Sequence, residues 1–214
     1  MRSWSIVCSG NSINLSSLCL EYITSHLKDY YGKVLLWGRT GKKQAVIIPD
    51  MTDIAATAAM EINAPLELVW AVMLDFEKYP EWNPFIYQVT ALPEAFVIGS
   101  RFLLHVRWAN GATYKSWETL TELEPPSQTK GGGSTARLTY RYSSWHAVMG
   151  LVRAQREQVL SQSNGGVTTY RTRESFRGLL ARFVPLAAVK DGFRIHAEAL
   201  KQRAELLAKN AARK

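Results

Sequence analysis

One carboxylate in this sequence, Glu174, lies in a pattern that could support acid–base chemistry. Residues 167–176 read as a β-strand with alternating faces, and Glu174 shares its face with Tyr170 and Phe176. The opposite face carries three arginines and must face water: Arg171, Arg173 and Arg177. Burial in an apolar interior would raise the pKa of the Glu174 carboxyl and suit it to general acid or base work. The structural alternative places Glu174 at the rim of the sheet, bonded to a backbone group or paired with an arginine.

His196 is the second candidate for proton transfer. It lies on the apolar stripe of a helix over residues 193–209, a stripe that also contains Phe193, Ala197, Leu200, Ala204 and Leu207. A histidine there could hydrogen-bond a ligand carbonyl or relay a proton near neutral pH. The alternative is a histidine whose hydrogen bonds are satisfied within the core.

Aromatic and aliphatic side chains on the strands are candidates for lining an apolar cavity. In residues 101–108, alternation predicts Phe102, Leu104, Val106 and Trp108 inside and His105 outside. Tyrosine hydroxyls in apolar pockets orient ligands, and three tyrosines are candidates: Tyr140, Tyr142 and Tyr170. Each could equally be a core residue of a strand. Trp82 and Phe85 could shape the mouth of the cavity or be purely structural.

Several other kinds of chemistry find no support in the sequence. There is no CxxC, no HExxH and no cluster of Cys and His at zinc spacing, so we expect no metal and no cofactor. There is no Gly-x-Ser-x-Gly elbow, and Cys8 and Cys19 have no assigned partner that would activate them. No RNA-binding sheet motif is present, so we expect no nucleic-acid partner.

Composition and charge favour a globular protein. The chain has 214 residues, of which 47% are hydrophobic, and a formal net charge of +8. Residues 136–214 carry 15 Lys and Arg against 5 Asp and Glu, a balance that could attract an anionic membrane or ligand. The alternative is that these charges solvate strand and helix faces. The longest uncharged run is rich in Ser, Asn and Gly, and no clear signal peptide is present, so we expect a cytoplasmic protein.

The elements that position these residues divide into two regions. Residues 1–50 read as an appended segment with a helix over 13–31 and a small hairpin, strands 34–37 and 45–48. Residues 51–214 form the main domain. It begins with a strand over 56–62 and a helix that Pro65 opens and that ends near Tyr79-Pro80.

Six further strands and a long helix complete the main domain. The strands are expected over 86–91, 100–108, 113–123, 137–145, 152–161 and 167–176, with Pro125-Pro126 among the turn signals between them. Short connectors predict an antiparallel meander, because parallel strands need long crossovers. In the terminal helix, Pro185 should cause an interruption and Asp191-Gly192 an offset. This order predicts α+β architecture.

Five segments together resemble the SRPBCC superfamily, which includes polyketide cyclase/dehydrase-like proteins, START lipid-binding domains and birch-pollen-allergen-like proteins. The first two are Glu-Ile-Asn-Ala-Pro-Leu-Glu-Leu-Val-Trp at 61–70 and Asp-Phe-Glu-Lys-Tyr-Pro-Glu-Trp-Asn-Pro-Phe at 75–85. The others are Leu-Thr-Glu-Leu-Glu-Pro at 120–125, Arg-Glu-Ser-Phe-Arg-Gly-Leu-Leu at 173–180 and Gly-Phe-Arg-Ile-His-Ala-Glu-Ala-Leu-Lys at 192–201. The resemblance covers about residues 55–208 and leaves residues 1–50 outside.

The resemblance implies a helix-grip fold, in which a curved antiparallel sheet wraps a long C-terminal helix around an internal apolar cavity. It also implies binding, and possible transport, of a hydrophobic small molecule or lipid. The alternative it implies is a polyketide cyclase, aromatase or dehydratase-like enzyme, with Glu174 and His196 as acid and base. A third alternative is delivery of a lipid or quinone to an anionic membrane. Phe176, Phe193 and Leu200 join the ligand-binding candidates named above.

Overall fold

The computed structural model describes residues 54–144, 151–163, 166–178 and 180–213, together with four short strands nearer the N-terminus. The chain divides into two units, Met1–Thr52 and Asp53–Lys214. The first contains an antiparallel sheet of order β2-β1-β3-β4, built from β1 (Trp4–Cys8), β2 (Asn11–Leu15), β3 (Lys33–Trp37) and β4 (Lys43–Ile47). Residues 13–15 of the helix expected over 13–31 lie in β2, and the rest of that segment lies outside the described residues.

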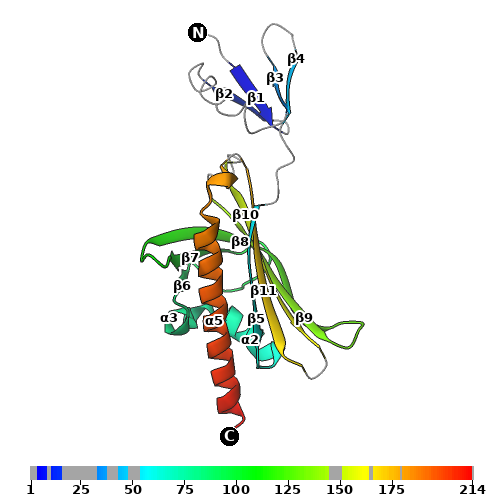
Figure 1. Ribbon diagram of the computed structural model, residues 1–214, viewed down its shortest axis with the longest axis vertical. Coiled ribbons are helices and arrows are strands. Elements are labelled where there is room, and N and C mark those ends of the chain that lie inside the picture. The colour runs from blue at the N-terminus through cyan, green and yellow to red at the C-terminus, as the bar shows by residue number, and fades with distance from the viewer. Residues whose placement is uncertain are drawn as a thin grey trace. The chain divides into compact units, whose positions relative to one another are not determined.

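The second unit is a seven-stranded antiparallel sheet of order β5-β11-β10-β9-β8-β7-β6. Its strands are β5 (Ile54–Ile62), β6 (Ile86–Thr90), β7 (Arg101–Arg107), β8 (Thr113–Gln128), β9 (Ser134–Tyr142), β10 (Arg153–Gln162) and β11 (Thr168–Arg177). Figure 1 shows this sheet curling around the long helix α5 (Leu186–Ala211). The predicted helix-grip fold, in the α+β class, is confirmed.

The first helical region is more broken than the sequence predicts. Helix α2 (Leu66–Leu74) begins after Pro65, whose carbonyl accepts the N–H groups of Leu68 and Val69. It ends at Leu74 rather than near Tyr79-Pro80. A 3-10 turn, η1 (Phe76–Lys78), follows, and then the short helix α3 (Tyr79–Trp82). Pro80 thus lies in the first turn of α3, where its missing N–H costs nothing.

Three further proline and glycine signals act differently from the expectation. Pro125 and Pro126 lie inside β8, at a point where the register with β9 shifts. Proline has no N–H to donate to a neighbouring strand, and such an irregularity in the pairing accommodates it. Pro185 does not interrupt α5; it caps the N-terminus of that helix. A 3-10 turn, η2 (Ala181–Phe183), precedes it. Asp191-Gly192 lies within continuous α5, so the expected offset is absent there.

Gly192 has a packing role in α5. A Cβ built at this position would lie 2.2 Å from a ring carbon of Phe85. Glycine therefore allows the aromatic ring after α3 to pack directly on the helix backbone. The ring of Phe85 also meets that of Phe193 edge-on, with centroids 6.2 Å apart.

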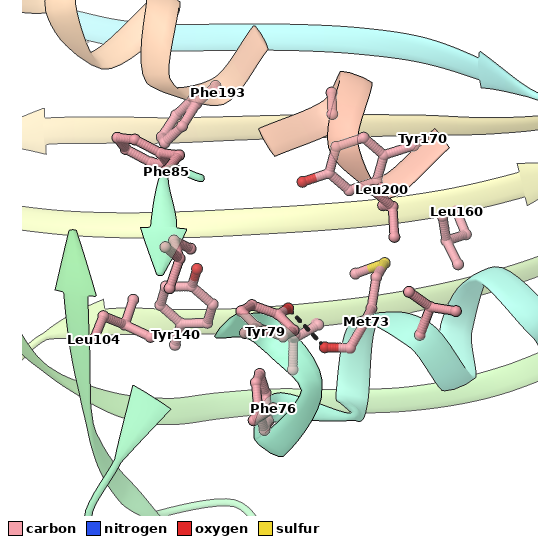
Figure 2. Packing of buried hydrophobic residues seen from close by; sticks show 14 of the residues in the cluster. Met73, Phe76, Tyr79, Phe85, Leu104, Tyr140, Leu160, Tyr170, Phe193 and Leu200 are labelled. Atoms are coloured by element: carbon pink, nitrogen blue, oxygen red, sulfur yellow. Dashed lines mark hydrogen bonds between the residues drawn. The ribbon is translucent and has the colours of Figure 1, made fainter. Parts of the chain in front are cut away.

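The core fills the space between the curled sheet, α2, α3 and α5 (Figure 2). Polar contacts between exposed groups help to attach α5 to its neighbours. The Lys201 ammonium donates to the carbonyl of Glu61 at 2.7 Å, the Asn63 N–H donates to the Glu205 carboxylate at 2.9 Å, and Arg203 pairs with Glu81 at 2.9 Å. The helix is thereby held against the inward face of the sheet.

Candidate ligand-binding site

Strand alternation divides β11 and β10 into two chemically different faces. On β11, the inward residues include Tyr170, Thr172, Glu174 and Phe176, while the predicted outward arginines are exposed. On β10, the inward residues are Ala154, Arg156, Gln158 and Leu160. An arginine and a glutamine therefore face the interior, which the sequence reasoning did not foresee.

Arg156 is the central cation of this interior and is only 3% exposed. Its Nε donates to the hydroxyl of Thr172 at 3.0 Å, and its guanidinium lies over the ring of Phe193, 4.1 Å from the centroid. Its Nη2 is buried and has no hydrogen-bond partner among the described residues. Glu174 and Tyr140 are its cross-strand partners in the sheet register. A guanidinium stays protonated in proteins, so this interior holds a permanent positive charge.

Two inward carboxyl groups accompany Arg156. Burial raises the pKa of Glu174 to about 7, although the charge of Arg156 acts in the opposite direction. Burial also raises the pKa of Glu118 to about 8, against a hydrogen bond from the Ser116 hydroxyl at 2.6 Å. Both groups therefore carry protons over much of the range up to neutral pH. Part of the Glu174 surface remains exposed, whereas Glu118 is buried.

The hydrogen bonds of His196 determine which of its ring nitrogens carries the proton. The Oδ1 of Asn83 accepts the backbone N–H groups of Phe85 and Ile86, at 3.1 and 2.9 Å. The amide Nδ2 of Asn83 must then be the atom that lies 2.8 Å from Nδ1 of His196, and it donates to that nitrogen. Burial, aided by the charge of Arg156, lowers the pKa of His196 well below its usual value. The imidazole is therefore neutral, with its proton on Nε2.

The Nε2–H of His196 is a buried donor without a hydrogen-bond partner among the described residues. Three aromatic rings stand around the imidazole: Trp82, Tyr79 and Tyr170, with centroids 6.0, 6.2 and 5.9 Å away. A fully buried donor in aromatic surroundings is costly unless something accepts its hydrogen bond.

Tyrosine hydroxyls extend the polar cluster. The Tyr170 hydroxyl donates to Oε1 of Gln158 at 2.8 Å, and Nε2 of Gln158 donates to the Tyr140 hydroxyl at 3.5 Å. Burial raises the pKa of both tyrosines, so they are neutral hydroxyls. Figure 2 shows Tyr140 and Tyr170 projecting into the interior from the sheet, and Tyr79 bonded at 2.8 Å to the carbonyl of Met73.

The remaining predicted site residues occupy a range of positions. Those that are buried in the interior are Phe85, Phe102, Leu104, Val106, Phe176, Phe193 and Leu200. Trp82 and Trp108 are half-buried; Trp82 packs on Tyr79, and Trp108 packs on Phe85. Tyr142 is also half-buried, and its hydroxyl lies 3.1 Å from that of Tyr114. The structure thus gathers Glu174, His196, Tyr140 and Tyr170 around Arg156 and places Tyr142 nearer the surface.

His105 lies on the outward face of β7, as alternation predicts, but it is not exposed. Its Nε2 is 2.8 Å from the hydroxyl of Thr90 on β6, and the ring meets Tyr87 edge-on. The neighbouring edge strand covers it, so it takes no part in the interior cluster.

Sequence reasoning missed four members of the cluster: Asn83, Glu118, Arg156 and Gln158. The segment 153–158 has charged or amide side chains on both faces, so alternation alone cannot say which face is inside. On β8, the large aromatic Trp117 is 38% exposed, and the neighbouring Glu118 is 6% exposed. Strand register is the signal that could have placed Arg156 inside. Arg156 pairs across the sheet with Tyr140, which alternation predicts to face inward.

Two surface hollows lie elsewhere. One lies around the turn between β8 and β9, and the other covers the outward face of β5, β10 and β11. None of the described helices is both long and apolar enough to span a bilayer.

Comparisons with known proteins agree with this architecture. Solved structures similar to the chain include the Zhui aromatase/cyclase from a Streptomyces species, with 17% identity, TM-score 0.53, and coverage of 71% of this chain and 93% of that one. A START superfamily protein from Mycobacterium smegmatis has 19% identity, TM-score 0.52, and coverage of 72% and 98%. The major latex-like protein 151 from Panax ginseng has 10% identity, TM-score 0.53, and coverage of 71% and 97%. At these identities, the structures establish the fold.

The sequence itself gives the family. No curated protein matches the chain. The family model described as polyketide cyclase / dehydrase and lipid transport matches residues 53–205, which is nearly the whole second unit. The chain therefore belongs to the polyketide cyclase/dehydrase and lipid transport family.

Proposed function

We propose that the second unit binds one hydrophobic small molecule or lipid between the inward face of its sheet and α5. The observation that carries this proposal is the polar cluster around Arg156 and His196, which lies inside a largely apolar core and has two buried donors with no partner among the residues that the structure describes. An interior built only for stability has little use for a buried cation, because apolar residues of similar volume often stabilise a core as well or better. Binding sites, by contrast, combine apolar walls with a few polar groups that orient the ligand.

In this proposal the walls and the polar groups have separate roles. Apolar side chains such as Phe102, Leu104 and Phe193 remove ligand surface from water, at about 25 cal/mol per Å². Arg156, His196 and the two tyrosines fix the orientation of the polar end. The rings of Phe85 and Trp82 lie in the segment that follows α2 and pack beside α5, where a small displacement would admit a ligand.

Native mass spectrometry of protein purified from its own host, with extraction of bound compounds, tests binding directly. A stoichiometric lipid, sterol, quinone or polyketide is the expected result. A protein that carries no ligand and takes up none from a broad panel of such compounds would contradict the proposal. Contact with an anionic membrane stays a prediction of the sequence.

A cyclase-like activity is the second candidate, and the raised pKa of Glu174, about 7, favours it. Ionised Glu174 would remove a proton α to a carbonyl of a poly-β-ketone chain. The Nε2–H of His196 and the Arg156 guanidinium would stabilise the enolate oxygen. The enolate carbon would attack a second carbonyl of the same chain, and the resulting alkoxide would take the proton back from Glu174.

This activity predicts a separation of binding from turnover. Glu174→Gln or His196→Ala should abolish turnover of a linear poly-β-ketone and retain its binding, whereas Glu157→Gln on the outward face of β10 should retain both. Normal turnover in the Glu174 and His196 variants would remove the assignment.

A further inference from the structure

Two buried hydrogen-bond donors in the interior each lack an acceptor among the described residues. They are Nη2 of Arg156 and Nε2–H of His196. The proton of His196 is on Nε2 because Nδ1 already accepts from the amide of Asn83. Both positions therefore call for an acceptor, and a second donor would satisfy neither of them.

The two donors face one interior region from opposite elements. Arg156 projects from β10, and His196 from α5. Phe193, less than one helical turn before His196, supports the guanidinium on its ring, and the ring of Tyr170 lies 5.9 Å from the imidazole. The Tyr170 hydroxyl bonds to Gln158, the next inward residue after Arg156 on β10. The walls that carry the two donors are thus in contact with each other.

We propose that the ligand is an amphipathic carboxylic acid whose carboxylate accepts hydrogen bonds from Arg156 and His196. This inference rests on the proposed binding function and names its ligand class. A carboxylate is acceptor-only and planar, which suits an arginine fork, whereas an alcohol also brings a donor that the two nitrogens cannot satisfy. One negative charge also balances the one permanent positive charge of the cluster.

The neighbouring carboxyl groups are compatible with such a ligand. Burial keeps Glu118 and Glu174 largely protonated below neutral pH, with pKa values raised to about 8 and about 7. Protonated carboxyl groups do not repel a carboxylate, and each can donate a hydrogen bond. The apolar body of the acid would lie among the aromatic side chains of the core, such as Phe85 and Phe102.

Matched ligand sets test this assignment by calorimetry at about pH 6.5, where carboxylic acids are ionised. One set is dodecanoic acid, dodecanol and methyl dodecanoate; the other is naphthoic acid, naphthyl methanol and methyl naphthoate. We expect the acid of at least one set to bind about 10- to 100-fold more tightly than its alcohol and ester, as the loss of a charge-assisted hydrogen bond implies. Arg156→Met, similar in size but uncharged, should remove that preference and retain binding of the alcohol.

Two further variants show whether a folding defect, and not the loss of the charge, explains a change in acid binding. Thr172→Val keeps the charge but removes the acceptor that holds Nε of Arg156, so it should weaken acid binding about 3- to 10-fold. Arg171→Met, on the outward face of the same strand, should bind like the parent. Circular dichroism and thermal unfolding verify that each variant is folded.

The outcomes separate this inference from the proposed function. Alcohols and esters that bind as tightly as the acids, or an acid preference that survives in both Arg156→Met and Thr172→Val, would overturn the carboxylate assignment and leave ligand binding intact. Failure of all six compounds to bind would overturn the carboxylate assignment, and the broad panel described above would then decide the proposed function.

Discussion

Arg156 and Arg171 belong to neighbouring strands of one sheet and have opposite surroundings. Arg171 faces outward and is exposed, and the outward Arg137 pairs with glutamates on both adjacent strands at 3.2–3.9 Å. Arg156 faces inward and is 3% exposed, and its Nη2 has no hydrogen-bond partner in the part of the chain that the structure describes. Exposed ion pairs contribute little to stability because water already solvates both charges. A buried charge is costly, and the proposed ligand would account for its retention.

The first prediction concerns stability on the two faces of β11 and has the largest expected effect. Tyr170→Ala should lower the free energy of unfolding by about 3–5 kcal/mol, because it removes a fully buried ring and the hydroxyl that donates to Oε1 of Gln158. Thr169→Ala, one residue away on the outward face, should change it by less than about 0.5 kcal/mol. Chemical denaturation measures both values, and equal losses would show that the two faces do not differ as described.

The second prediction concerns pH. Because the pKa of Glu118 is raised to about 8 from 4.5, the folded state holds more protons than the unfolded state between these values. This contribution to stability is present at low pH and is lost as pH rises, by about 2–3 kcal/mol between pH 6 and pH 8. Glu174 adds a loss of the same sign up to about pH 7.

Glu118→Gln isolates this effect, because the amide does not ionise. Its free energy of unfolding should fall less steeply than that of the parent between about pH 6 and pH 8, whereas Glu157→Gln on the outward face should follow the parent. Parallel curves for Glu118→Gln and the parent would contradict the described burial.

The third prediction tests the charges of the interior through the pH dependence of ligand affinity. As pH rises from about 6 to 9, Glu118 and Glu174 ionise beside the charge of Arg156, so the balance of these three groups changes from positive to negative. The titratable side chains around Arg156 also include Tyr79, Tyr140, Tyr170 and His196, which stay neutral over this range because their pKa values are shifted away from it. Affinity for dodecanoic acid should therefore fall by about 10-fold or more, whereas affinity for dodecanol should not.

The double variant Glu118→Gln, Glu174→Gln is the matched test of that prediction. Calorimetry should find its affinity for dodecanoic acid nearly independent of pH. A pH-dependent decrease equal to that of the parent would place its cause outside these two carboxyl groups.

The fourth prediction is the smallest effect. Arg171→Met should change the free energy of unfolding by less than about 0.5 kcal/mol, because the guanidinium stays in water in both the folded and the unfolded state. Thermal unfolding measures it alongside Arg156→Met. A large decrease in the free energy of unfolding of Arg171→Met would mean that the outward charges contribute more to stability than their exposure indicates.

Much of the fold was accessible from sequence, because strands and helices are local patterns. The two-residue period placed Tyr140, Tyr170 and Glu174 inward and the three arginines of β11 outward. Proline was a weaker guide, since Pro80 begins a helix and Pro125 lies within a strand. Its effect depends on whether a neighbouring strand or turn needs the missing N–H, which is not a local property.

The sequence by itself determined the family, the order of the elements and the faces of the strands that have one apolar side. Only the tertiary structure decided that Arg156 and Glu118 are inside, because polar residues occur on both faces of their strands and the pairing with β9 and β7 sets the burial. It also decided the proton position of His196, through an asparagine 113 residues away. Curling the sheet around α5 brings these groups together, and burial then changes their pKa values and leaves Nη2 of Arg156 and Nε2 of His196 without a partner in the described part of the chain.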